Sequence, residues 1–185
     1  MDCYYPPIDK KRVFPYLSQG IIILNTNRCM EQLTHQEIDR YLGTYLEQYK
    51  LIKDIKYFQG EIEAELIPFI YPFTKEDSGY VNNTQINLYL SQLTYILLAK
   101  SISDKSFTLI SNLISSADFD KRMHERQLFF TNINLKMKKV IYKKNMPIRG
   151  RIKISNTRKI AGRIFCDLEF DLHKGSCSGT LMGVY

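Results

Sequence analysis

The sequence predicts a mixed α+β domain in which a curved antiparallel sheet wraps around one long, buried helix. Three observations predict it. Residues 78–99 contain no charged side chain, although 24% of the 185 residues are charged. A strand, helix, strand pattern precedes this run, and a series of alternating strands joined by short turns follows it. A one-sided sheet and an apolar helix are stable when they bury each other.

The uncharged run fits a helix that begins at Asn82. Asn82 is a good N-cap, and Gln85 follows at the capping-box spacing. At about 100° per residue, one sector is apolar and another is polar. The apolar sector holds Ile86, Leu90, Leu93 and Leu97, and the polar sector holds Thr84, Asn87, Ser91 and Thr94. The polar residues argue against a membrane span, which needs about 20 mostly apolar residues.

Two interpretations of the polar sector remain open. In the first, the helix is a core element whose Ser and Thr hydroxyls bond back to the preceding turn. In the second, the polar N-terminal part of the helix lines a pocket. Buried amides such as that of Asn87 fit the first interpretation less well, because an unpaired buried amide costs about 1–3 kcal/mol.

Upstream of this helix, we expect an extended arm over residues 1–18 and a single domain over residues 19–185. Residues 20–24 are typical of a short buried strand. Thr34 and Glu37 form a capping box for an amphipathic helix over residues 35–49. Residues 55–67 alternate as one strand, whose glutamates Glu61, Glu63 and Glu65 we interpret as a solvated row rather than a catalytic cluster.

Downstream of the helix, residues 107–114 fit either a helix or a strand. The following pattern predicts four strands, over residues 129–141, 149–155, 160–171 and 176–184, separated by turn signals at 145–147, 156–158 and 173–175. Four successive strands with short turns form an antiparallel meander. A meander wrapped around one buried helix is the layout of the hot-dog fold.

The net charge of +7 is concentrated in one stretch. Residues 136–163 contain eleven Lys or Arg and no Asp or Glu. This stretch fits a solvated basic face, a nucleic-acid-binding surface, a site for a phosphorylated cofactor arm, or a docking site for an acidic carrier protein. No nucleic-acid-binding motif is present, so we expect no nucleic acid partner. The candidate carrier- or phosphate-binding residues are Lys143, Lys144, Arg149 and Arg151.

Cysteine and histidine usage gives no support for a metal site or covalent catalysis. The four cysteines lack paired metal-ligand spacing, and Cys166 and Cys177 fall in predicted strands as small core residues. No secretory signal precedes the domain, so we expect reduced thiols and a cytoplasmic location. His35, His124 and His173 are interpreted as surface residues. We expect no metal and no cofactor.

The remaining candidate chemistry lies at the start of the uncharged helix. Its unpaired backbone amides, backed by the helix dipole, are suited to polarising a carbonyl oxygen that gains negative charge. A thioester carbonyl is such a group. An apolar tunnel between the helix and the sheet would hold its acyl chain.

The residues around this helix resemble the FcoT-like hot-dog family. Residues 79–82 (Gly-Tyr-Val-Asn) followed by residues 90–95 (Leu-Ser-Gln-Leu-Thr-Tyr) are similar to the central-helix signature of that family. Residues 46–49 (Leu-Glu-Gln-Tyr) resemble its Leu-Glu-x-Tyr motif, and residues 168–170 and 175–179 resemble its last hairpin. The resemblance extends from about residue 35 to the end, and its most specific part is residues 79–95.

The resemblance implies an enzyme of fatty acyl thioesters carried by CoA or by an acyl carrier protein. Members are described as long-chain acyl-CoA thioesterases, or as enzymes of isonitrile lipopeptide pathways that add glycine to a 2-enoyl carrier-protein thioester. Tyr49 and Asn82 match polar active-site residues of the family, whereas Ser91 and Thr74 stand where it has Asn and Tyr. Those two differences leave the reaction type open.

We therefore predict a homodimeric or larger hot-dog enzyme whose first-choice reaction is thioester hydrolysis. Conjugate addition of glycine is the runner-up, and a dehydratase-like or non-catalytic carrier-binding module is a further alternative. The predicted catalytic residues are Tyr49, Asn82 and Ser91. The predicted substrate-binding residues are Gly79, Tyr80, Asn83, Tyr71 and Gln92.

Overall fold

A computed structural model describes residues 30–69, 77–105, 107–125, 129–145 and 147–184. Its strands are β1 (Glu31–Gln32), β2 (Ile52–Phe58), β3 (Glu61–Leu66), β4 (Phe129–Met137), β5 (Ile148–Ile160), β6 (Arg163–Leu172) and β7 (Cys177–Val184). Its helices are α1 (His35–Tyr41), α2 (Asn83–Ser103), α3 (Thr108–Ser111) and α4 (Ser116–His124), with single 3-10 turns at η1 (Glu47–Tyr49) and η2 (Lys143–Asn145). The predicted arm, the strand at 20–24, Tyr71 and Thr74 lie outside the described residues.

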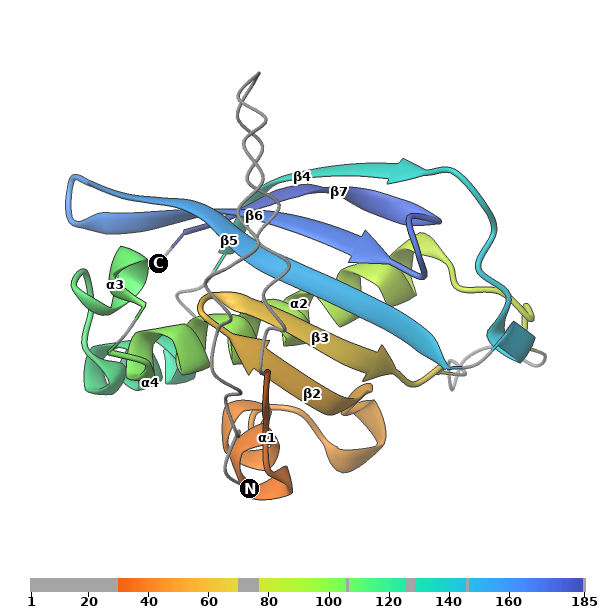
Figure 1. Ribbon diagram of the computed structural model, residues 1–185, viewed down its shortest axis with the longest axis horizontal. Coiled ribbons are helices and arrows are strands. Elements are labelled where there is room, and N and C mark those ends of the chain that lie inside the picture. The colour runs from red at the N-terminus through yellow and green to blue at the C-terminus, as the bar shows by residue number, and fades with distance from the viewer. Residues whose placement is uncertain (1–29, 70–76, 106, 126–128, 146, 185) are drawn as a thin grey trace, which may run out of the picture.

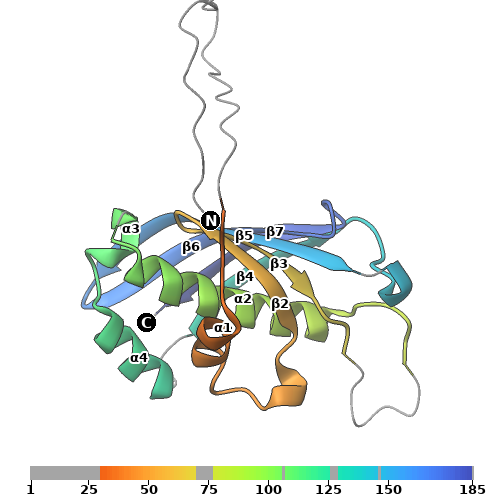
Figure 2. The ribbon, with the colours of Figure 1, turned by 60° about the horizontal axis from the view of Figure 1, so that its bottom comes forward.

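The described strands form one antiparallel sheet in the order β1-β2-β3-β5-β6-β7-β4. The long helix α2 crosses one face of this sheet, and the other helices lie on the same side (Figures 1 and 2). The prediction of a mixed α+β domain with a large antiparallel sheet and a long helix is confirmed.

The predicted four-strand meander is wrong in one respect. β5, β6 and β7 are consecutive neighbours, but β4 pairs with β7 at the far edge of the sheet and not with β5. Sequence order suggested the β4–β5 contact. The connection from β4 instead passes the end of the sheet before the chain enters β5 beside β3 (Figure 1).

Helix α2 begins as predicted. Asn82 caps it, with its side-chain oxygen accepting from the backbone N–H of Gln85. The four residues of the predicted apolar sector have no exposed side-chain surface. The helix extends four residues beyond the predicted end at Ala99. The charge of Lys100, the first residue past that end, is balanced by ion pairs with Glu31 and Glu37.

Several other helix and strand boundaries differ from the predicted ones because of where the chain turns. The single strand predicted over residues 55–67 is the hairpin β2–β3, whose turn residues Gln59 and Gly60 both have positive φ. A Cβ on Gly60 would lie 2.2 Å from the Phe107 ring, so only glycine fits this turn. The strand predicted at 149–155 is longer in the structure, the strand predicted at 160–171 begins only at Arg163, and the chain turns at Ala161 and Gly162 rather than at 156–158.

The helical segments also differ from expectation. α1 ends at Tyr41, and the chain up to Tyr49 forms a loop and the turn η1 rather than a continuous helix. The ambiguous segment 107–114 contains the helix α3, and α4 was not predicted. Within the described residues, no helix is long and apolar enough to cross a membrane.

Candidate functional site

The chain enters α2 along a short antiparallel contact with the segment that precedes β5. The Val81 N–H donates to the Ile141 carbonyl (2.8 Å), and the Lys143 N–H donates to the Gly79 carbonyl (2.9 Å). Tyr80 and Tyr142 form the bridge between these two bonds. The position of the α2 N-terminus is therefore fixed by the connection between β4 and β5.

The predicted residues at this N-terminus are mainly exposed. Gly79 has a φ of +72°, and a Cβ there would meet no atom within 4 Å, so glycine is required for its backbone conformation and not for close packing. Tyr80 and Asn83 face solvent. Asn82 is half-buried; its side chain accepts from the Gln85 N–H (3.0 Å), and the Gln85 side chain accepts from the Asn82 N–H (3.4 Å).

Lys143 lies inside this arrangement rather than on its surface. Its side chain is 9% exposed, and its ammonium group donates to the Phe69 carbonyl (2.9 Å) and to the Asp77 carboxylate. The side-chain bond from Lys143 holds the pKa of Asp77 below its usual value. Lys143 was predicted to bind an external phosphate; in the structure its ammonium group joins the described residues on either side of segment 70–76.

The Phe69 carbonyl also accepts from the side chain of Gln85, which is fully buried. The ring of Phe69 in turn meets the Tyr49 ring edge-on, with 5.3 Å between centroids. Asn82 and Tyr49, two of the predicted catalytic residues, are thus connected through Gln85 and Phe69.

Gln92, a predicted substrate-binding residue, is fully buried between two backbone groups. It donates to the Tyr49 carbonyl (2.5 Å) and accepts from the Leu51 N–H (2.9 Å). One turn earlier, the Tyr89 hydroxyl donates to the Ile67 carbonyl (2.8 Å). Gln85, Tyr89 and Gln92 therefore form a polar strip along α2 that attaches the helix to the chain at residues 49–51 and 67–69.

Ser91, the third predicted catalytic residue, lies on a neighbouring face of α2. It is half-buried, and its hydroxyl donates to the Asn87 carbonyl (2.9 Å). This is the back-bond expected for a helical serine. Adjacent helix positions are about 100° apart, so Ser91 and Gln92 point in different directions. The structure brings Tyr49 and Asn82 together through Phe69 and leaves Ser91 apart from that network.

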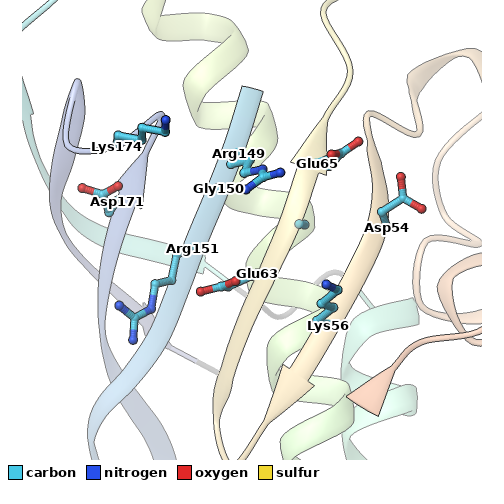
Figure 3. Close-up of a pocket in the computed structure, with 10 residues that line it drawn as sticks. Asp54, Lys56, Glu63, Glu65, Arg149, Gly150, Arg151, Asp171 and Lys174 are labelled. Carbon is cyan, nitrogen blue, oxygen red and sulfur yellow. The ribbon is translucent and has the colours of Figure 1, made fainter. Parts of the chain in front are cut away.

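The predicted basic residues Arg149 and Arg151 lie on the face of the sheet that points away from α2. There they line a hollow of about 350 Å³ (Figure 3). Ala64 and Gly150 are cross-strand partners in this hollow. The charged residues around it are Asp54, Lys56, Glu63, Glu65, Arg149, Arg151, Asp171 and Lys174.

The order of the strands places acidic side chains beside Arg149 and Arg151, and these neutralise the positive charge of this part of the basic stretch. Arg151 stands directly between Glu63 of β3 and Asp171 of β6, and its Nε donates to Glu61 (2.6 Å). The hydrogen bond that Arg151 donates to Glu61 is the main cause of the raised pKa of Arg151. Arg149 likewise faces Glu65 across β3. The stretch has no acidic residue in sequence, but in space acidic strands flank β5 on both sides.

Two thiols lie in the described part of the sheet. Cys166 and Cys177 are buried, as predicted, and burial is the main cause that raises the pKa of Cys177 to about 11. Among the described residues, no group of three or more His, Cys, Asp or Glu side chains is placed to hold a metal ion.

The sequence did not reveal the contacts of Asp77, Phe69 and Tyr89. Gln85 was signalled by its capping-box spacing, but its second role, donating to the Phe69 carbonyl, depends on the path of the preceding loop. The partnership of Asp77 with Lys143 joins residues 66 positions apart, so no local pattern could indicate it.

The chain was compared with known proteins. No family model and no curated protein matches it. It is similar to the crystal structure of an HP0420 homologue from Helicobacter felis, with a TM-score of 0.47 and 13% identity over 80% of this chain and 88% of that chain. A likeness at this level assigns the chain to no family.

Proposed function

We propose that this protein is a cytoplasmic hot-dog enzyme that hydrolyses fatty acyl thioesters carried by CoA or an acyl carrier protein. The observation that supports the proposal is the N-terminus of α2. Asn83 and Thr84 are the first two residues of the helix, so their backbone N–H groups have no partner within it, while Asn82 already caps Gln85. A buried helix of 21 residues directs its positive dipole end to this point.

In the proposed reaction, these two backbone amides and the side-chain N–H of Asn82 donate to the thioester carbonyl oxygen. The oxygen gains negative charge when water attacks the carbonyl carbon, so the amides stabilise the transition state more than the substrate. The Tyr49 hydroxyl orients the water. The acyl chain lies between α2 and the sheet, and the thiol of the carrier leaves with a proton.

Three substitutions separate a chemical role from a structural one. Asn82→Ser keeps an N-cap and removes only the amide, whereas Asn82→Ala removes both and costs about 1 kcal/mol of stability. Tyr49→Phe keeps the ring contact with Phe69 and the backbone carbonyl that Gln92 binds. We expect palmitoyl-CoA hydrolysis to fall at least about tenfold in Asn82→Ser and Tyr49→Phe with unchanged thermal unfolding. Full activity in both variants would refute the site.

Conjugate addition of glycine to a 2-enoyl carrier-protein thioester remains the alternative reaction. The same amides would stabilise the enolate oxygen formed when an amine attacks the β-carbon. Incubation with saturated and 2-enoyl thioesters, with and without glycine, separates the two reactions by product mass. Hydrolysis releases the free acid, and addition increases the mass of the thioester by that of glycine.

A specific observation favours a second candidate function, a non-catalytic carrier-binding module. Asn82, Ser91 and Gln92 all have side-chain hydrogen bonds within α2 or to the neighbouring backbone. Such residues could be structural only. Binding of acyl thioesters without turnover of any of them would support this candidate over the enzyme.

We further propose that two copies associate through β4. Among the described strands, β4 is a sheet edge of nine residues, paired on one side with β7. Long edge strands are usually protected by charges or prolines, yet Lys136 is the single charged residue of β4. Antiparallel pairing of β4 with its copy would satisfy the open edge and place the two Lys136 side chains apart, on either side of the symmetry axis.

A further inference from the structure

Four neighbouring lysines of the basic stretch lie together without an ion pair in the described part of the chain. Lys136, Lys138, Lys139 and Lys144 are exposed, and none forms an ion pair within the described part of the chain. By contrast, Lys143, Arg151, Lys153 and Arg158 of the same stretch are each paired with an acidic residue. Arg149, Lys159 and Arg163 form no ion pair among the described residues either, but Arg149 faces Glu65 and the other two lie at the β5–β6 turn. The largest group of unpaired charges is therefore at the end of β4 and in the connection that follows it.

The same segment exposes apolar side chains between its lysines. Val140 is 52% exposed and Tyr142 is 47% exposed, and the Lys144 ammonium lies 5.6 Å from the centre of the Tyr142 ring. Large apolar residues that are exposed among positive charges are typical of a surface that binds a partner of opposite charge. We call the four lysines together with Val140 and Tyr142 the basic surface.

The basic surface adjoins the candidate site. Tyr142 bridges to Tyr80, two residues before the cap of α2, and the backbone of residues 141–143 bonds to that of residues 79–81. In Figure 1 the connection from β4 to η2 passes the end of the molecule at which α2 begins. A partner docked on the basic surface would deliver a flexible arm directly to the α2 N-terminus.

We propose that the basic surface is the docking site of an acidic acyl carrier protein. This inference rests on the proposed function for the identity of the cargo. The class of partner is inferred from the surface itself. Lysines dispersed around apolar groups complement a negatively charged protein face that has apolar residues at its centre. A lone phosphate would require converging donors, and these lysines are instead spread along nine residues of chain. The proposal moves the carrier contact away from Arg149 and Arg151, which acidic strands neutralise.

The test compares two triple variants with the same change in charge. The first is Lys136→Glu, Lys138→Glu and Lys139→Glu, on the basic surface. The control is Lys105→Glu, Lys159→Glu and Arg163→Glu, three exposed cations near α3 and the β5–β6 turn, at the other end of the sheet (Figure 1). Binding of a purified acyl carrier protein in its apo and palmitoylated forms is measured at low and high salt, together with hydrolysis of palmitoyl-CoA.

We expect the first variant to bind both carrier forms at least about tenfold more weakly, and the control to bind like the unaltered protein. We also expect the affinity of the unaltered protein to fall with salt, and palmitoyl-CoA hydrolysis to be similar in all three proteins. Equal weakening in both variants, or in neither, would overturn the docking site.

The other outcomes separate this proposal from the proposed function. Hydrolysis of palmitoyl-CoA without any carrier binding would overturn the docking site and leave the enzyme. Carrier binding that the first variant loses, without turnover of any thioester, would support docking and overturn the enzyme.

Anionic phosphatidylglycerol vesicles and a single-stranded oligonucleotide are tested in parallel. Loss of their binding in the first variant, with no carrier binding by the unaltered protein, would assign the surface to a membrane or a nucleic acid.

Discussion

Lys143 forms an ion pair with Asp77 in which the lysine is almost fully buried. The pair lies just before the cap of α2, and the same ammonium group also binds the Phe69 carbonyl. It therefore couples the connection before β5 to the end of β3 and to the start of the central helix.

This ion pair makes stability depend on pH in the acidic range. The pKa of Asp77 is lowered in the folded protein, so its stabilising contribution is complete above the usual value of 3.8 and is lost as the pH falls through the lowered pKa. We expect Asp77→Asn to unfold at lower urea than the unaltered protein at pH 7, and the difference to shrink below pH 3.8. A difference that stays constant down to pH 2 would contradict this.

Removal of the ammonium group should have a larger effect at Lys143 than at its neighbour. Lys143→Met leaves the Asp77 carboxylate and one lone pair of the Phe69 carbonyl without this donor, so we expect a lower urea midpoint. Lys144→Met removes an exposed charge and should change the free energy of unfolding by less than about 0.5 kcal/mol. Similar effects of the two substitutions would show that the burial of Lys143 has no energetic role.

The Gln92 amide should be necessary for stability. Gln92→Leu is similar in size but leaves the Leu51 N–H and the Tyr49 carbonyl buried without this partner. Each unsatisfied group costs about 1–3 kcal/mol, so we expect a loss of about 2–4 kcal/mol in the free energy of unfolding, measured with urea. Gln48→Leu, at an exposed position of η1, is the control and should be near neutral.

Association through β4 should be sensitive to charge at the centre of that strand. Ile133 is 37% exposed. Under the proposed pairing, Ile133→Lys would place two positive charges close to the symmetry axis, so we expect light scattering to show a monomer in place of a dimer. Ile160→Lys alters a more exposed isoleucine at the β5–β6 turn and should leave the dimer intact. A monomer in the unaltered protein would refute the pairing itself.

The buried thiols should be inert in the folded protein. With a pKa of about 11, Cys177 carries only about 0.1% thiolate at pH 8, and Cys166 has no exposed surface. In a variant with Cys3→Ser and Cys29→Ser, we expect iodoacetamide to modify neither remaining cysteine at pH 8 in buffer and both in urea, as measured by intact mass. Rapid labelling of either thiol in buffer would show that the sheet opens locally.

The sequence predicted features that depend on local spacing. The capping boxes at Thr34 and Asn82, the apolar sector of α2 and the outward positions of Glu63 and Glu65 require only a helical or strand period. The prediction that Glu61 belongs to the same solvated row was wrong, because Glu61 is buried, at 8% exposure, and accepts from Arg151. The prediction was wrong where turns decided the outcome. The hairpin at Gln59 and Gly60 was read as continuous strand, because a two-residue turn barely interrupts the alternation of side chains.

Features that depend on strand order could not be predicted. Arg151 looked uncompensated because its acidic partners Glu61 and Asp171 lie 90 residues before it and 20 after it in sequence. The same holds for the candidate site. Asn82 and Tyr49 were selected by resemblance, but the Phe69 and Gln85 contacts between them arise only when the end of β3 packs beside α2.

The strip formed by Gln85, Tyr89 and Gln92 also determines how α2 is oriented about its own axis. Most sides of this helix are apolar and buried, so hydrophobic burial alone would tolerate several rotations and small axial slides. The three side chains of the strip must hydrogen-bond to particular carbonyl and amide groups at residues 49–51 and 67–69, and only one rotation of the helix permits this. Changes among the aliphatic residues of α2 should therefore alter how tightly the core is filled, whereas a change in the strip should release the helix to rotate and move Asn82 with it.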